Sequence, residues 1–307
     1  MTESTPQCIA ITGANGLIGA ALTSTLKAEG RDVVRLVRRR ATAPDEVEWD
    51  PLADYVDTDG LAGVEAVVHL AGAGVGDHRW TDSYKREIRD SRVVGTATLA
   101  KSLASLASPP RTLISGSAIG FYGDTGDLEV DESAPRGSGF LAEVVVEWEA
   151  AAEPARAAGI RVVHPRSGLV ASKRGGAWKR LFPIFKAGGG GRLGSGDQYW
   201  SYISLRDEIA ALTFLLEHES TPSGRLEGPV NLTSPTPVTN REVTAAMGRV
   251  LHRPTPFPVP AFALNIALGE FSSEVLGSIR AVPRALLEAG FVFRDDTIDR
   301  AITAALE

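Results

Sequence analysis

Short apolar runs alternate along the first half of the chain with longer segments in which apolar residues recur every three or four positions. Such runs are typical of buried strands, and the segments between them are typical of amphipathic helices. Continuous apolar strands alternating with helices predict a doubly wound, Rossmann-like α/β fold, in which a parallel sheet binds ligands at the carboxyl ends of its strands. The strands are expected over residues 8–12, 32–37, 46–49, 66–70, 111–115 and 160–164.

Capping signals and breaks place the helices and divide the chain. Thr81 is expected to cap a helix that reaches Leu106, and Ser204 is expected to cap a later one. Thr239 to Glu242 form a capping box that predicts the start of another helix. A glycine-rich stretch over 175–196 and four prolines between 254 and 260 interrupt regular structure. We expect a Rossmann domain over 1–171 and 199–235, and a smaller, mostly helical, substrate-binding part over 172–198 and 236–307.

Composition narrows the classes of partner. The chain has 307 residues, of which 43% are hydrophobic and 23% charged, and its formal net charge is -6. This balance is typical of a soluble globular protein and gives no electrostatic footprint for nucleic acid or for an anionic membrane. We expect a cytoplasmic protein without a metal, because no His, Cys, Asp and Glu residues cluster at ligand spacing and the one cysteine, Cys8, lies in an apolar strand.

Residues 9–19, IAITGANGLIG, join the first strand to a helix through three glycines. Glycines at such a turn let the backbone approach a pyrophosphate, which the free amides and positive end of the helix attract. The sequence therefore predicts a dinucleotide site, although a tight turn that only packs helix on strand would use the same glycines. The turn residues expected to bind the dinucleotide are Gly13, Asn15, Gly16, Leu17, Ile18 and Gly19.

The end of the second strand predicts which dinucleotide binds. An acidic residue commonly binds the adenosine ribose there, but this strand ends in three arginines. A guanidinium at this place favours the 2′-phosphate of NADP(H), with charge-assisted hydrogen bonds worth roughly 1.5 to 3 kcal/mol each. We expect Arg38 and Arg39 to bind the phosphate; the alternative is a solvated basic turn.

Several motifs resemble the extended short-chain dehydrogenase/reductase superfamily: TGANGLIG, HLAG over 69–72, and SGSAIGFYGD over 115–124. RWTDSYKREIRDSRVVGT over 79–96 and VNLTSPTPVTN over 230–240 resemble its epimerase family protein subgroup, a nucleoside-diphosphate-sugar epimerase-like group. The resemblance implies use of NAD(P), with Arg166 either binding a ligand or anchoring its loop. Further coenzyme residues that it implies are Leu70, Ala71, Gly72, Ser115 and Pro165.

The superfamily's Tyr-x-x-x-Lys pair is missing. None of the five tyrosines has a lysine four residues later, and alignment within the helix FLAEVVVEWEAA puts Leu141 and Val145 at the two positions. Another group must then exchange the proton. Glu143 or Glu147 is the candidate replacement base, with a solvated helix face as the alternative. Ser117, which matches the superfamily's serine, is expected to hold a substrate hydroxyl or else to cap a turn, and Tyr122 is expected to contact nicotinamide or substrate or else only to pack.

Three residues are expected to bind substrate: Arg92 through a phosphate or carboxylate, and Arg192 and Gln198 from a glycine-rich loop that closes over the ligand. A surface salt bridge is the alternative role of Arg92. The resemblance favours an NADP-dependent oxidoreductase or epimerase that acts on a sugar nucleotide or similar small polar molecule. A homodimer is one expected oligomeric state. The missing pair favours the alternative of a non-catalytic NADPH-binding protein that senses redox state or serves as a scaffold.

Overall fold

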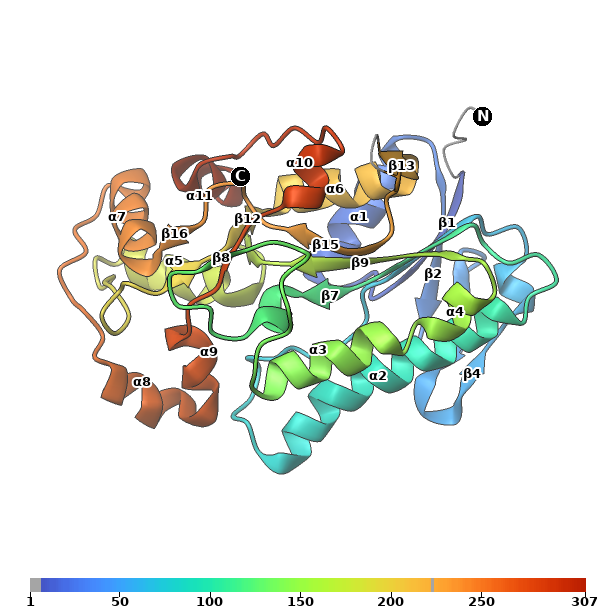
Figure 1. Cartoon of the computed structure of the whole chain (residues 1–307), viewed down its shortest axis with the longest axis horizontal. Coiled ribbons are helices and arrows are strands. Elements are labelled where there is room, and N and C mark those ends of the chain that lie inside the picture. Colours follow the sequence, from blue (N-terminus) through green and yellow to red (C-terminus); the bar gives the residue numbers. More distant parts are fainter. Residues whose placement is uncertain (1–6, 222–223) are drawn as a thin grey trace.

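A large, mostly parallel sheet forms the centre of the molecule (Figure 1). The computed structural model describes residues 7–221 and 224–307. Every pair of neighbouring strands is parallel except β3 with β4, so the predicted doubly wound parallel sheet is confirmed. The strand order is β15 (Gly228–Leu232), β9 (Arg161–Ser167), β6 (Thr112–Ser115), β5 (Ala66–His69), β1 (Cys8–Thr12), β2 (Asp32–Val37), β3 (Glu46–Asp50) and β4 (Tyr55–Val56), and β7 (Ser117–Ala118) pairs with β9.

Alternating side chains of the strands enter two separate cores. In β1, Ile9 and Ile11 pack under α1 (Leu17–Ala28) and α6 (Leu205–Glu217), whereas Ala10 faces α2 (Asp82–Ala104) and α4 (Glu153–Ala157). The helix α3 (Phe140–Ala150) lies beside α2 on that second face (Figure 1). Both faces are therefore covered, and ligands reach the sheet at its edges.

Side-chain caps begin several helices where the sequence predicts them. Thr81 accepts a hydrogen bond from the backbone amide of Tyr84 at the start of α2, and Ser204 accepts one from Asp207 at the start of α6. Thr239 and Glu242 form the predicted capping box of α7 (Asn240–Leu251). These starts were predictable because a cap is a contact between residues three positions apart.

A third core lies beyond the carboxyl edge of the sheet. Helices α5 (Gly176–Lys186), α7 and α11 (Ile298–Ala305) surround it and contribute Trp178, Met247 and Ile302. Three short pairs lie nearby: β10 (Leu169–Ala171) with β12 (Tyr202–Ser204), β11 (Tyr199–Trp200) with β16 (Val238–Thr239), and β8 (Glu129–Val130) with β17 (Arg280–Ala281). The other elements are β13 (Ser220–Thr221), β14 (Gly224–Arg225), α8 (Ala261–Leu268), α9 (Ser272–Leu276), α10 (Arg284–Glu288), and 3-10 turns at Pro51–Ala53, Asp59–Leu61, Ile119–Tyr122 and Gly269–Phe271.

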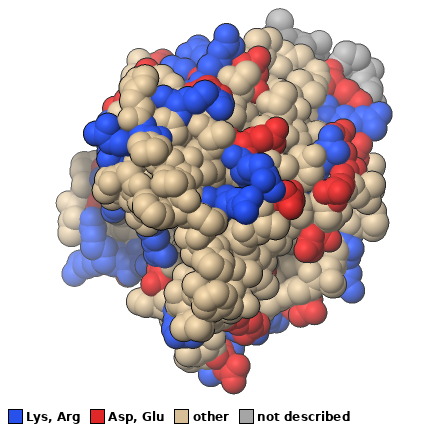
Figure 2. Space-filling view, turned by 90° about the vertical axis from the view of Figure 1, so that its left-hand side faces the viewer, with Lys and Arg blue, Asp and Glu red and all other residues tan. Residues whose placement is uncertain are grey.

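The end of the molecule that carries α7 and α8 presents charges of both signs, with uncharged surface between them (Figure 2). Phe257, Phe262 and Ile266 are exposed in and just before α8. None of the helices within the described residues combines the length and the apolar character that crossing a membrane requires.

Candidate functional site

The glycine turn after β1 has no room for side chains. Gly13 has a φ of +67°, and a β-carbon there would lie 2.8 Å from the carbonyl carbon of Leu70. A β-carbon on Gly19 would lie 2.2 Å from the carbonyl oxygen of Gly13. The turn is closed by a 2.9 Å hydrogen bond from the amide of Gly16 to the same carbonyl. Glycine is therefore required at Gly13 and Gly19 for α1 to begin this close to the sheet.

The N-terminus of α1 has neither a capping side chain nor an acidic residue to bind its free backbone amides. Its N-cap, Gly16, has no side chain to accept a hydrogen bond, and no acidic residue lies in the first turn. By contrast, α2, α6 and α7 are capped by a threonine or a serine. The first amides of α1, at Leu17 and Ile18, and the positive end of the helix are thus available to an anion, beside the exposed Asn15. This cradle fits the pyrophosphate of a dinucleotide.

A buried Thr–His contact joins this turn to the end of β5. The Oγ1 atom of Thr12 accepts hydrogen bonds from the backbone amides of Leu70 (3.0 Å) and Ala71 (3.1 Å). Its own proton is then donated to Nδ1 of His69 at 2.7 Å, so the His69 ring is neutral and carries its proton on Nε2. Burial lowers the pKa of His69 to about 4, which agrees with a neutral ring. Thr12 and His69 therefore fix the segment 70–72 against the turn, a role that the sequence analysis missed.

The two arginines after β2, Arg38 and Arg39, differ in whether their side chains are bound to an acidic residue. Arg39 binds Glu46 through two contacts of 2.6 and 2.8 Å, and these bonds, with those from Thr42, lower the pKa of Glu46 to about 2. Arg38 is exposed and forms no hydrogen bond or ion pair with any described residue. A phosphate at this place would meet Arg38 without competition, whereas Arg39 would have to leave Glu46.

A polar network lies at the carboxyl ends of β6 and β9. Ser117 donates a 2.6 Å hydrogen bond to Oε1 of Glu149, and Arg166 binds both carboxylate oxygens of Glu149 at 2.8 and 2.9 Å. Arg166 also donates to the hydroxyl of Tyr122 at 3.1 Å, and Tyr122 donates to Asn231 at 2.7 Å. The contacts connect α3, β9, β15 and the turn after β7 in one array.

Electrostatics fix the charge states within this network. Burial alone would raise the pKa of Glu149, but the hydrogen bonds and charge of Arg166 and the hydrogen bond of Ser117 hold it below its usual value. Burial raises the pKa of Tyr122 against the opposing effect of Arg166. Glu149 is therefore a carboxylate at neutral pH, and Tyr122 is a neutral phenol whose side chain is 2% exposed.

The acidic residue predicted on α3 does not contact the serine. Glu143 is exposed, and the carboxylate on Ser117 belongs to Glu149, nearly two turns later. Arg166 lies in β9, and its guanidinium binds Glu149 and Tyr122; ligand binding by Arg166 stays a prediction. Pro165 precedes it in β9, and Ser115, at the end of β6, is fully buried with its Oγ unpartnered among the described residues.

The glycine-rich segment before β11 is packed, not open. Gln198 is 7% exposed, and its amide nitrogen donates to the carbonyls of Leu193 (3.0 Å) and Val275 (3.5 Å). A β-carbon on Gly191 would lie 1.8 Å from the carbonyl oxygen of Phe257. Glycine here permits close approach of two backbones, which differs from the expected closing loop. Arg192 lies half-buried in the same segment.

One buried acid was not predicted. Glu208, in the first turns of α6, is fully buried; Ser167, at the end of β9, donates a 2.6 Å hydrogen bond to Oε1, and Oε2 has no partner among the described residues. Burial raises the pKa of Glu208 to about 7, against the opposing hydrogen bond. A carboxyl group in this position is largely protonated in mildly acidic solution.

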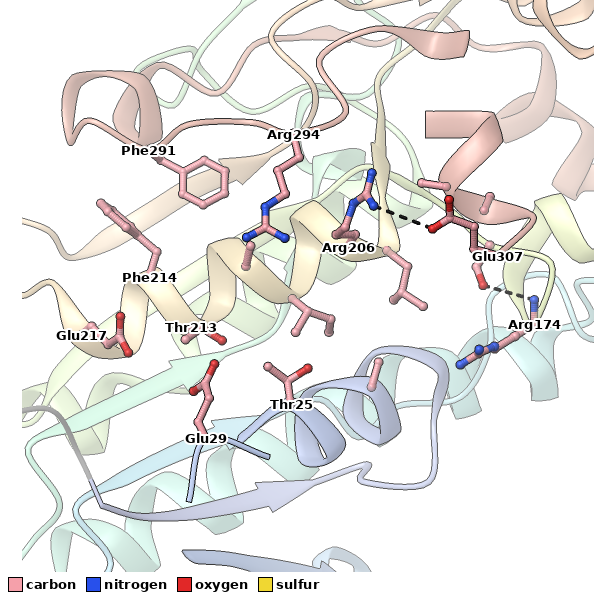
Figure 3. A pocket seen from close by; sticks show the side chains of 17 residues that line it. Thr25, Glu29, Arg174, Arg206, Thr213, Phe214, Glu217, Phe291, Arg294 and Glu307 are labelled. Carbon is pink, nitrogen blue, oxygen red and sulfur yellow. Dashed lines mark hydrogen bonds and ion pairs between the residues drawn. The ribbon is translucent and has the colours of Figure 1, made fainter. Parts of the chain in front are cut away.

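A groove among the described residues lies away from this site. It has a volume of about 520 Å³ and runs between the second half of α1 and α6, where Thr25 and Glu29 face Thr213 and Glu217 (Figure 3). None of the glycine turn and none of the Ser117 network lines it. Across residues 7–221 and 224–307, no three His, Cys, Asp or Glu side chains come together as a metal site would require.

Comparison with known proteins shows the family of the chain. The family model described as NAD dependent epimerase/dehydratase family matches residues 9–231, and one described as a domain of unknown function matches residues 259–305. An epimerase family protein of Mycobacterium tuberculosis is 45% identical over 295 residues, which are 96% of both chains. The epimerase family protein SDR39U1 of Bos taurus is 34% identical over 289 residues, 92% of this chain and 94% of the relative.

Two solved structures share the fold. The human epimerase family protein SDR39U1, crystallised with NADPH, matches with a TM-score of 0.86 and 28% identity, covering 97% of this chain and 99% of that chain. A nucleoside-diphosphate sugar epimerase from Corynebacterium glutamicum matches with a TM-score of 0.79 and 36% identity, covering 98% of this chain and 58% of that one. The predicted NADP(H) coenzyme agrees with the NADPH of the human structure. The resemblance to the extended short-chain dehydrogenase/reductase superfamily is confirmed, and the chain belongs to the NAD-dependent epimerase/dehydratase family.

Proposed function

We propose that this protein binds NADP(H) and oxidises or reduces a carbinol carbon of a small polar substrate, with a sugar nucleotide as the first class to test. The observation that carries the proposal is the array of Ser117, Glu149 and Arg166 at the same sheet edge as the glycine cradle. The coenzyme, when bound, supplies or accepts the hydride. A sugar nucleotide is favoured because the similar Corynebacterium protein is named as a nucleoside-diphosphate sugar epimerase.

The amide groups that begin α1 hold the pyrophosphate in this proposal. The 2′-phosphate is bound chiefly by Arg38, because the guanidinium of Arg39 is already paired with Glu46. Ser115 and Pro165 lie at the nicotinamide end in this proposal, and Ser115 is fully buried with its Oγ unpartnered among the described residues.

The direction of one hydrogen bond defines what Ser117 does. A carboxylate only accepts hydrogen bonds, so the Ser117 proton is committed to Glu149 and the lone pairs of Oγ face away from it. Ser117 therefore accepts a hydrogen bond from a substrate hydroxyl. As hydride leaves the carbinol carbon, the hydroxyl proton passes to Ser117 Oγ while the Ser117 proton passes to Glu149 Oε1; reduction follows the reverse path.

A non-catalytic NADPH-binding protein is the second candidate function. One observation favours it: Val145, at the position of the superfamily lysine, is 3% exposed, and Tyr122 is committed to Asn231 and Arg166. In that case the site would bind coenzyme without exchanging a proton, and the protein would report the redox state or support a partner.

A coenzyme-oxidation assay tests the catalytic proposal. NADPH consumption and NADP⁺ reduction are followed with UDP-, GDP- and dTDP-sugars and with simple carbonyls and alcohols, after titration has measured coenzyme affinity. Glu149→Gln keeps a hydrogen-bond acceptor for Ser117 but cannot take its proton, so we expect turnover to fall by about 100-fold or more, within the usual range for an acid–base group.

Two further variants make this test specific. Glu143→Gln replaces the other carboxylate predicted on α3, and a loss confined to that variant would assign the base to Glu143. Glu87→Gln is the matched control, since Glu87 is exposed on α2. Tight NADPH binding with no turnover of any compound would refute the catalytic proposal and support the non-catalytic one.

A further inference from the structure

Arg92, on α2, is a cation without an acidic partner at the ligand edge of the sheet. Its Nη1 donates to the backbone carbonyl of Ile88 at 3.0 Å, and its guanidinium carbon lies 5.1 Å from the ring centre of Trp148 on α3. Among the described residues no carboxylate forms an ion pair with it. One turn earlier on the same helix, Arg89 forms a 2.5 Å ion pair with Glu147 of α3.

The guanidinium of Arg92 lies against a glycine of the predicted coenzyme site. A β-carbon on Gly72, just after β5, would lie 3.4 Å from the guanidinium carbon and 3.5 Å from Nη1. The Trp148 ring beneath the cation would lie 3.2 Å from a β-carbon on Gly116, just after β6. Arg92 is therefore placed between the carboxyl ends of β5 and β6, where the topology of the sheet puts a ligand.

The surroundings of Arg92 leave its charge uncompensated. Burial lowers the pKa of Arg92 to about 10, so the side chain remains charged at neutral pH. The other arginine at this edge, Arg166, is neutralised by the two oxygens of Glu149. A desolvated cation without a counterion is costly, and this one is stabilised once a ligand brings oxygen acceptors to it.

The position of Arg92 is close to the place on α3 where the superfamily has its lysine. The alignment of the superfamily pair puts Val145 at the lysine position, and Trp148 lies on the same face of α3 less than one turn later. We propose that Arg92 supplies from α2 the cation that the superfamily lysine supplies from α3, and that it binds ribose and phosphate oxygens in the nicotinamide half of NADP(H). Arg92 then binds the coenzyme and not the substrate phosphate or carboxylate that the sequence analysis expects. The proposal rests on the proposed coenzyme binding.

Titration calorimetry with two coenzyme probes tests the proposal. NADPH contains both halves of the coenzyme, whereas adenosine 2′,5′-bisphosphate contains only the adenine half. Arg92→Met keeps an unbranched apolar stem but removes the guanidinium, and with it the charge and the contact with Trp148. We expect it to weaken NADPH at least tenfold, to change the bisphosphate less than twofold, and to be partly rescued by Arg92→Lys.

A matched variant and three outcomes complete the test. Arg86→Met removes an exposed charge from the same helix and is expected to leave both affinities unchanged. Unchanged NADPH affinity in Arg92→Met would overturn the proposal, and so would an equal loss for both probes, which would indicate damage to the whole site. If the unaltered protein bound neither probe, the proposed coenzyme function itself would fail, a result distinct from the other two.

Discussion

Replacing Glu208 with glutamine is expected to change how the stability of the protein depends on pH. Glu208 is fully buried, and its pKa is raised from 4.5 to about 7. The folded state therefore holds a proton over a range in which the unfolded state has lost it. The contribution of Glu208 to stability is highest below pH 4.5, falls as pH rises towards 7, and changes little above that value.

The size of this effect follows from the shift in pKa. Each unit of pKa corresponds to about 1.36 kcal/mol, so the interval from pH 5 to pH 8 is expected to cost the natural protein roughly 2 to 3 kcal/mol through Glu208. The side chain introduced by Glu208→Gln stays neutral and can still accept the hydrogen bond from Ser167. The variant is therefore expected to lack this loss.

Urea denaturation at pH 5, 6, 7 and 8 measures the difference. His69 and His164 have pKa values lowered to about 4 and act with the opposite sign, since their contribution is lost as pH falls below 6.5. Subtracting the curve of Glu208→Gln from that of the natural protein removes their effect, and Glu227→Gln, an exposed acid, serves as the control. Parallel curves for the natural protein and Glu208→Gln would refute the reasoning.

Four further substitutions test the glycine turn, the two arginines after β2 and the cap of α7. Gly19→Ala places a β-carbon 2.2 Å from a backbone oxygen, so NADPH affinity measured by calorimetry is expected to fall at least tenfold, about 1.4 kcal/mol; unchanged affinity would contradict the cradle. Arg38→Ala is expected to reduce the preference for NADPH over NADH by at least tenfold and more than Arg39→Ala does, because Arg39 is held by Glu46; equal effects would count against this. Thr239→Ala removes the capping box and is expected to cost about 1 kcal/mol in urea denaturation, and no change would show that the cap contributes little.

The framework was predictable because it depends on local patterns. The strand 8–12 agrees with β1, and the capped starts of α2, α6 and α7 agree with Thr81, Ser204 and Thr239. An apolar run and a capping residue each carry their information within a few positions. The glycine turn was equally predictable, because the strand before it and the helix after it directly adjoin it in the sequence.

The site was less predictable because its contacts join distant parts of the chain. Glu149 was not predicted as a site residue, yet it binds Ser117 and Arg166, which lie 32 and 17 positions away. Spacing gives no sign of such a triad, although an acid one turn after the lysine position was a usable hint. The burial of Glu208 was even harder to predict, since a Glu in the first turns of a helix normally faces solvent.

The order of the strands also has a consequence for how the chain folds. β15 completes the edge of the sheet beside β9, but α5, β11, β12 and α6 are synthesised between them. The hydrogen bond between Tyr122 and Asn231 joins a residue that precedes β9 to a residue of β15. The sheet edge and the candidate site therefore assemble late and together, after closure of a long loop, which favours slow folding and leaves any chain that stops short of β15 without a complete candidate site.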